Sequence, residues 1–168
     1  MKKYELTNVI KIGQHGTTVH QIRACIKFTI NSNNVVEPGD IGGYIETENN
    51  LSHNGVAWVS DNAEVSGNAQ VSGNARVSDN ARVSGGAWVC DGARVSGDAH
   101  VYGEARVSGN AQVSGDAWVF GEARVSENAW IHGHAWVSGN AEVSGNADVF
   151  LATGDAFDLE KKTPHQIE

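Results

Sequence analysis

The stretch SGNARVSDNARVSGG, residues 72–86, decides the fold because it repeats a unit of six residues. From Ala57 to Ala152 this unit follows itself sixteen times without an insertion. Its first position is always Ala, and its third is Val in every unit except at Ile131. The second position varies among Arg, Trp, Gln, Glu, His and Asp. A fixed short period of this kind indicates a repeat architecture, in which each unit packs on its neighbours.

The order Ala-x-Val within each unit is typical of a short β-strand, in which alternate side chains point to opposite sides. Ala and Val therefore point inwards, whereas the second side chain and the Ser after Val point outwards. The Gly-Asn, Gly-Asp or Asp-Asn pair that follows supplies turn residues that tolerate positive φ, and Asn at the same corner of successive coils predicts amide ladders. A helix is excluded, since Gly recurs too often and the hexad does not match the helical period. Strands too short to bury their own faces must stack, which predicts a β-solenoid.

The repeat resembles the hexapeptide repeat of left-handed parallel β-helix proteins, in which three hexads form one triangular coil. This resemblance implies an all-β fold, a left-handed parallel β-helix of about six coils over residues 39–152, with Leu51, Ile45 and Ile41 as further inward positions. The whole arrangement, in which GDIGGYIETENNLSHNG (residues 39–55) leads into the hexad repeats, also resembles small phage and prophage proteins and bacterial proteins described as hexapeptide transferases.

Residues 1–38 and 153–168 lie outside the repeat. The stretch VHQIRACIKFTI, residues 19–30, alternates apolar and polar side chains and predicts one strand with a buried face, paired with residues 3–13. We expect residues 1–38 to form a small N-terminal β cap, because the open end of a solenoid needs covering. In the C-terminal cap and polar tail, residues 153–168, we expect Phe157 and Leu159 to cover the last coil.

The charge balance narrows the class of partner. Lys and Arg total 12 against 20 for Asp and Glu, and the net charge of −8 argues against direct binding of nucleic-acid phosphates. No apolar run approaches the ~18 residues of a membrane span and no signal peptide opens the chain, so we expect a soluble cytoplasmic protein. The resemblance to phage and prophage proteins implies that this cytoplasm is that of a bacterial host cell. Cys25 and Cys90 follow no disulfide or metal spacing.

With three hexads in each coil, outward side chains that are three hexads apart become neighbours on one face. The first face carries Trp58, Arg76, Arg94, Gln112, Trp130 and Asp148. The second face carries Glu64, Arg82, His100, Trp118 and Trp136, and the third Gln70, Trp88, Arg106, Arg124 and Glu142. Two ion pairs and one cation–π contact between stacked neighbours are predicted: Glu64–Arg82, Arg124–Glu142 and Trp88–Arg106.

Aromatic residues gather on the second face, because Tyr102 and Phe120 also replace Ser at its other outward position. A contiguous aromatic patch marks an interface or a ligand groove, so we predict self-association through it. The patch continues around the corner through His132, and its predicted binding residues are Tyr102, Trp118, Phe120, Trp130, His134 and Trp136. The resemblance implies a homotrimer of parallel prisms.

Enzymes with this repeat are acyltransferases that use acyl-CoA or acyl-carrier protein, and γ-class carbonic anhydrases. The resemblance implies a His general base between two subunits, for which His100 and then His132 are the candidates. Against catalysis, the sixteen hexads contain no long loop that would enclose a substrate. A zinc site needs three ligands that converge on one point, and the spacing of His132, His134 and His100 does not predict one.

We therefore expect a non-catalytic binding or structural module, encoded by a phage or prophage, that needs no cofactor. It would display aromatic and Arg side chains to a protein partner or a small ligand. The alternative is an acyltransferase that binds acyl-CoA in a groove between subunits and uses a His general base.

Overall fold

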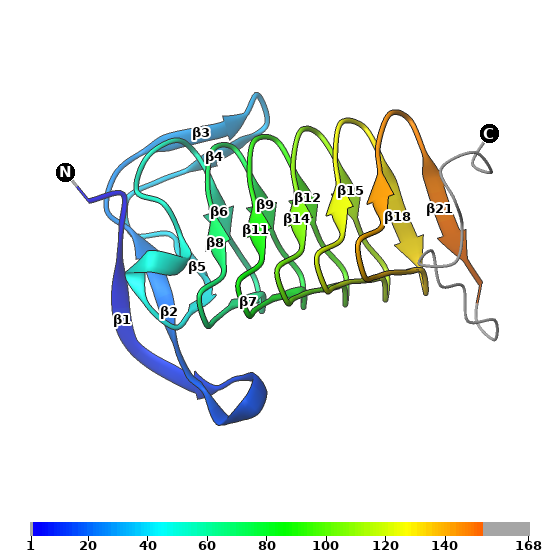
Figure 1. Cartoon of the computed structure of the whole chain (residues 1–168). Coiled ribbons are helices and arrows are strands. Elements are labelled where there is room, and N and C mark those ends of the chain that lie inside the picture. Colours follow the sequence, from blue (N-terminus) through cyan, green and yellow to red (C-terminus); the bar gives the residue numbers. More distant parts are fainter. Residues whose placement is uncertain (1, 153–168) are drawn as a thin grey trace.

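The computed structural model describes residues 2–152, which form a three-sided β-solenoid with a cap at its N-terminal end (Figure 1). The all-β solenoid fold is thereby confirmed, and its first face has six strands, in agreement with about six coils. The predicted role of Phe157 and Leu159 lies outside the described residues.

Each face of the solenoid is a parallel sheet built from short strands. The first face contains β6 (Trp58–Val59), β9 (Arg76–Val77), β12 (Arg94–Val95), β15 (Gln112–Val113), β18 (Trp130–Gly133) and β21 (Asp148–Leu151). The second contains β7 (Glu64–Val65), β10 (Arg82–Val83), β13 (His100–Val101), β16 (Trp118–Val119) and β19 (Trp136–Val137). The third contains β8 (Gln70–Val71), β11 (Trp88–Val89), β14 (Arg106–Val107), β17 (Arg124–Val125) and β20 (Glu142–Val143). The predicted register of three hexads per coil is confirmed, for example by the pairing of Arg82 with His100.

Columns of Ala and Val fill the interior of the solenoid. From Ala57 to Val137, every Ala at the first position and every Val or Ile at the third is at most 1% exposed. Backbone hydrogen bonds join each coil to the next; for example, the N–H of Trp58 donates to the carbonyl of Ala75 at 3.0 Å. Each buried Val contributes roughly 1.5 kcal/mol or more to stability, so the repeated pair holds the rod together.

The corners of the coils need backbone with positive φ. Gly103 has a φ of 72°, and a Cβ there would lie 2.9 Å from the backbone nitrogen and oxygen of Gly121 on the next coil. Asp91 occupies the same repeat position with a φ of 58°, and its carboxylate accepts a hydrogen bond from the N–H of Gly109 at 3.2 Å. The predicted amide ladders are confirmed at Asn62–Asn80 (3.3 Å), Asn110–Asn128 (3.4 Å) and Asn128–Asn146 (3.2 Å).

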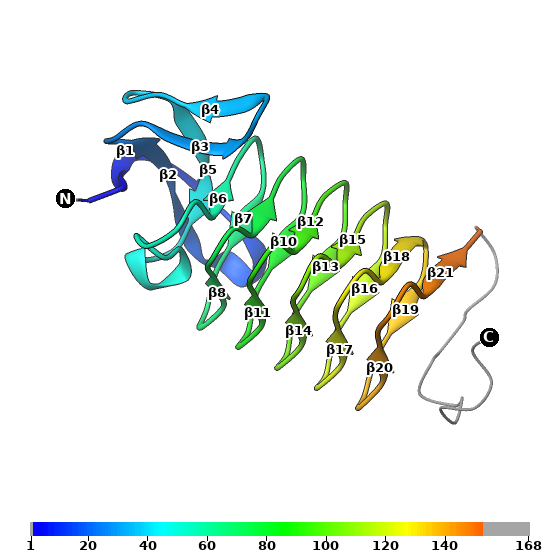
Figure 2. The same cartoon turned by 90° about the horizontal axis from the view of Figure 1, so that it is seen from above.

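The cap continues the second face beyond the first coil (Figure 2). Strands β1 (Tyr4–Ile12) and β2 (Thr18–Ala24) form an antiparallel pair joined by the 3-10 turn η1 (Gln14–Gly16). Strand β5 (Ile41–Ile45) pairs antiparallel with β2 and parallel with β7. The edge of the solenoid sheet is therefore covered by the cap hairpin rather than left open.

The first coil departs from the hexad register. Ile45 pairs with Val65, and Leu51, which follows the 3-10 turn η2 (Glu48–Asn50), bridges Val71, so each pair is slightly more than three hexads apart in the chain. Both Ile45 and Leu51 are fully buried, as predicted. The predicted inward position of Ile41 is wrong: its side chain is 54% exposed, because that end of β5 pairs with β2.

The stretch at residues 19–30 divides into two strands, so the prediction of a single strand is wrong. After β2 the chain bends where the N–H of Cys25 donates to the carbonyl of Lys3 at 2.8 Å. It then forms the hairpin of β3 (Phe28–Asn31) and β4 (Asn34–Val36), which lies over the start of the first face (Figure 1). Trp58 packs edge-on against Phe28 beneath it, with 5.3 Å between ring centroids, and is only 5% exposed.

The cap also changes one of the predicted ion pairs. Among the described residues Glu64 pairs with Lys11 of β1 at 2.9 Å, so the predicted Glu64–Arg82 pair is wrong. Glu64 is 9% exposed, because the cap hairpin lies over β7 and supplies Lys11 as its cation. The other two predicted contacts are confirmed: Arg124–Glu142 at 3.2 Å, and Arg106 over the Trp88 ring at 5.4 Å.

Candidate functional site

Five rings stack on the second face across three successive coils. We call this cluster the aromatic surface; it comprises His100, Tyr102, Trp118, Phe120 and Trp136. Along one column, ring centroids lie 4.8 Å apart for His100–Trp118 and 5.6 Å apart for Trp118–Trp136. Along the other, Tyr102 and Phe120 stack at 5.0 Å. Edge-on contacts of 5.9 Å (Tyr102–Trp118) and 6.4 Å (Phe120–Trp136) join the columns into one surface.

The repeat itself places these rings together. The parallel pairing of β13, β16 and β19 puts His100, Trp118 and Trp136 directly above one another. Tyr102 and Phe120 follow the inward Val of their strands and return to the same side of the sheet. The surface remains open to solvent at its C-terminal coil, where Trp136 is 44% exposed.

His100, the first candidate for a general base, forms the N-terminal edge of the aromatic surface. Its Nδ1 lies 3.3 Å from the side-chain nitrogen of Gln14, in the turn of the cap hairpin. Burial lowers the pKa of His100, and the positive charge of Arg82 lowers it further, against a smaller opposing effect of nearby aspartates. One ring face packs on Trp118 and one nitrogen meets Gln14, so the contacts of His100 join the cap to the ring stack.

The other predicted residues of the patch lie on the first face and its corner. Trp130 stacks on His132 with 4.0 Å between ring centroids, and its indole N–H donates to Ser114 at 3.1 Å. His132, the second candidate base, lies 2.7 Å from a carboxylate oxygen of Asp148. His134 lies 3.3 Å from Asp116 at the corner between the first and second faces. In the described part of the chain, no ring contact joins this group to the aromatic surface.

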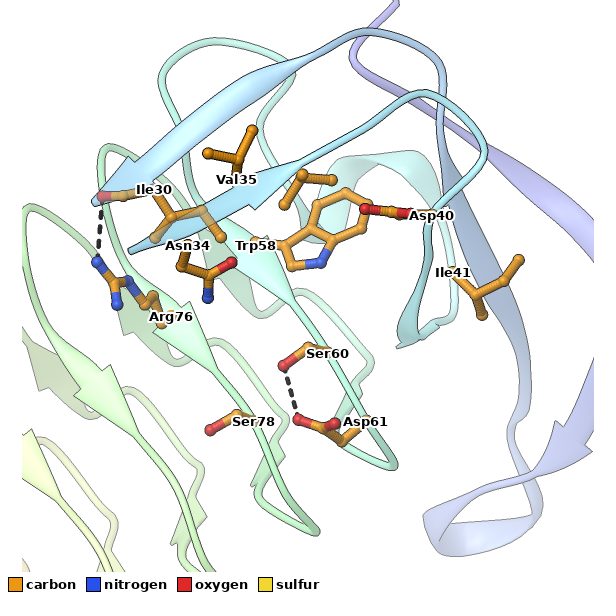
Figure 3. Close-up of a pocket in the computed structure, with 11 residues that line it drawn as sticks. Ile30, Asn34, Val35, Asp40, Ile41, Trp58, Ser60, Asp61, Arg76 and Ser78 are labelled. Atoms are coloured by element: carbon orange, nitrogen blue, oxygen red, sulfur yellow. Dashed lines mark hydrogen bonds between the residues drawn. The ribbon is translucent and has the colours of Figure 1, made fainter. Parts of the chain in front are cut away.

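A pocket of about 450 Å³ lies between the β3–β4 hairpin and strands β6 and β9 (Figure 3). Its apolar lining includes Ile30, Val35, Ile41 and Trp58. Its polar lining includes Asn34, Asp40, Ser60, Asp61 and Arg76. The sequence does not predict this pocket, because the hairpin that closes it docks on the repeat without following its period.

Residues 2–152 contain no group of three or more His, Cys, Asp or Glu side chains placed to hold a metal ion. None of the helices in that part of the chain has the length and apolarity that a bilayer crossing demands.

Comparison with known families agrees with the geometry. The family model described as "YdcK Beta solenoid repeat" matches residues 69–79, 75–91 and 105–121, which lie in the regular coils from β8 to β16. A search of curated proteins finds no match. The stacked coils and the family model together show that this chain is a β-solenoid repeat protein.

Proposed function

We propose that this β-solenoid is a non-catalytic binding and structural module that associates with further copies of itself through the aromatic surface. The observation that carries the proposal is the stack of five rings over β13, β16 and β19. A phage or prophage origin, and with it the cytoplasm of a bacterial host, belong to the same proposal. They rest on the resemblance of the whole arrangement in which residues 39–55 lead into the repeats.

The aromatic surface has the chemistry of a protein interface. Large rings contribute most of the binding energy of protein interfaces, since each buries a large area and loses few rotamers. Here the rings also stand on a backbone fixed by hydrogen bonds from coil to coil, such as Trp118 N–H to Ala135 carbonyl at 2.8 Å. A preorganised surface loses little conformational entropy when a partner covers it, which favours association.

The charges of the neighbouring face favour a second copy as the partner. Arg106 lies one hexad after His100, and Arg124 lies one hexad after Trp118, so each Arg lies on the third face of the same coil. When prisms pack around a three-fold axis parallel to the rod, surfaces at equal height meet. The rings of one protomer would then face the Arg side chains of the next, which is a cation–π arrangement. Heterologous contacts close into a ring only when the rotation between protomers closes, and the three-fold rotation of this arrangement gives a trimer.

Sedimentation velocity over a range of concentrations tests the proposal. We expect the wild-type protein to sediment at roughly three times its protomer mass of 17.8 kDa, and Trp118→Gln/Trp136→Gln to sediment as a monomer. Gln suits the substituted position because the repeat already carries it there at Gln70 and Gln112. The control is Trp130→Gln, which removes a ring of 42% exposure, close to the 44% of Trp136, from the first face.

A monomeric wild-type protein, or a double variant that still assembles, would refute the interface. A second variant, Arg106→Glu/Arg124→Glu, tests the orientation of the protomers. Loss of assembly supports contact between the second and third faces. Assembly that survives the Arg changes but not the Trp changes would instead indicate an interface between two second faces.

A further inference from the structure

The pocket beneath the β3–β4 hairpin is lined by donors that have no acceptor in the described part of the protein. Trp58 is 5% exposed, and its indole N–H donates to none of the described residues. Figure 3 shows the ring nitrogen on the side of the pocket that Ser60 lines. The Nε of Arg76, another lining residue, is buried and also lacks a partner there. Buried polar groups in folded proteins nearly always have a partner, so the buried Nε of Arg76 points to an acceptor that the pocket receives from outside, and the indole N–H of Trp58 is a second donor free to bind it.

Further polar groups around the pocket are free to bind hydroxyl groups. The Asn34 side-chain amide, which offers both a donor and an acceptor, makes no hydrogen bond to the described residues. The Asp61 carboxylate accepts from the Ser60 hydroxyl at 2.8 Å through Oδ2, which leaves its other oxygen available. Asp40 likewise uses one oxygen, at 2.8 Å from the N–H of Glu37.

The charges that line the pocket disfavour an anionic ligand. The lining contains two carboxylates, those of Asp40 and Asp61, and one guanidinium, that of Arg76. Arg76 donates to the carbonyl of Ile30 at 3.1 Å, which holds it against the hairpin, and burial together with the charge of Arg94 lowers its pKa. Within the described chain neither aspartate forms an ion pair. Ionised carboxylates without a cation form strong hydrogen bonds with neutral hydroxyl donors.

The remaining lining is apolar and partly open. Val35 is 41% exposed and Ile41 is 54% exposed, and both line the pocket together with Ile30. A volume of about 450 Å³ lies within the usual range for small-molecule sites. Apolar walls with a few separate hydrogen-bonding groups suit a ligand that has C–H faces and several hydroxyl groups.

We propose that this pocket binds a neutral sugar, either free or at the end of a glycan. One hydroxyl group of the sugar donates to the free oxygen of Asp61. A second hydroxyl group exchanges hydrogen bonds with the Asn34 amide. A third sugar oxygen accepts the indole N–H of Trp58, and a fourth accepts the buried Nε–H of Arg76. The C–H face of the ring packs on Ile30 and Val35.

The indole N–H signal of Trp58 in a two-dimensional nitrogen–proton NMR spectrum reports on the site, and Trp58→Phe assigns it. The probes are glucose, galactose, mannose and N-acetylglucosamine, with glucuronate as an anionic control. We expect at least one neutral sugar to shift the Trp58 signal in a saturable manner, and glucuronate to bind more weakly than that sugar. Loss of a charge-assisted hydrogen bond in Asp61→Asn should weaken binding about tenfold.

The control variant is Asp79→Asn, which changes the same corner position one coil further on. Asp61 and Asp79 have φ values of 58° and 60°, which Asn adopts readily, and Asp79 lies outside the pocket lining. We expect Asp79→Asn to bind as the wild type does. Thermal unfolding of both variants establishes that they are folded.

Three results would overturn the sugar site. The first is that no neutral sugar shifts the Trp58 signal at 50 mM, a concentration roughly fifty times a weak Kd of about 1 mM. The second is that glucuronate binds as well as the neutral sugar that binds most tightly, and the third is that the two Asn variants weaken binding equally. Methyl glycosides separate the two sources of ligand. A site for a glycan end accepts the methyl glycoside of the sugar, whereas a site that needs the free anomeric hydroxyl group rejects it.

Discussion

Lys3 is a cation buried where the cap meets the first coil, and its titration should control the pH dependence of stability. Lys3 is 1% exposed. Its Nζ donates to the carbonyl of Ala57 at 2.8 Å and lies 5.6 Å from the centroid of the Phe28 ring. Burial lowers the pKa of Lys3 from 10.5 to about 8, because the charged form is poorly solvated there.

The direction of the effect follows from the proton count. Between pH 8 and pH 10.5 the unfolded chain carries the Lys3 proton while the folded chain has lost it, so the free energy of unfolding rises with pH. For these two pKa values the gain from pH 7 to pH 9.5 is about 2 kcal/mol, equivalent to a rise of about 4–8 °C in Tm. Burial, and next the charge of Glu48, raise the pKa of Tyr4, so above pH 10 ionisation of Tyr4 in the unfolded chain opposes this gain.

Urea unfolding at pH 7, 8, 9 and 9.5, followed by circular dichroism, measures the effect as a difference between wild type and Lys3→Met. That difference should change by about 2 kcal/mol over this range in favour of the wild type. Lys2→Met is the control, since the Lys2 side chain is 61% exposed and pairs with Glu48. Parallel pH curves for wild type and Lys3→Met would refute a buried lysine that loses its proton in this range.

Three further changes test the packing of the rod, each by urea unfolding. Gly103→Ala should lower the free energy of unfolding by about 1–3 kcal/mol, because the φ of Gly103 is 72° and the new Cβ would contact the backbone of Gly121. An unchanged urea midpoint would contradict this account of the corners. In a double-mutant cycle, Arg124→Ala and Glu142→Ala should show a coupling below about 1 kcal/mol, since the two side chains are 60% and 69% exposed. Glu64→Gln should lower the free energy of unfolding by about 1–3 kcal/mol, since Glu64 is buried beneath the cap. A loss as small as the coupling of the exposed Arg124–Glu142 pair would show that burial does not strengthen the Glu64 interaction.

The regular coils follow directly from the sequence period. Each hexad places one Ala and one Val inwards, and three hexads return the chain to the same face, so stacking partners always lie three hexads apart. That rule alone predicts that Trp118 lies beside His100 and Trp136, and that Arg124 lies beside Glu142. Local strand geometry and repetition are sufficient here, because every coil has the same environment as the next.

The cap does not follow this rule, and the errors of prediction concentrate there. Ile41 has the spacing of an inward residue but pairs with β2 and is exposed. Trp58 and Glu64 occupy outward positions of the repeat, yet the two cap hairpins bury both of them. A hairpin that docks across a sheet brings together residues far apart in the chain, and no periodic pattern records where it lies.

The sequence by itself therefore determined the rod: its strands, corners, buried columns and the aromatic surface, because these depend on contacts that recur at a constant interval. Only the tertiary structure decided which outward residues stay in water and where a pocket forms. The unpartnered indole N–H of Trp58 and the free carboxylate oxygen of Asp61 line one pocket because the β3–β4 hairpin folds back over β6. The physical reason is that docking depends on the shape and charge of two finished surfaces, whereas stacking depends on the repeat.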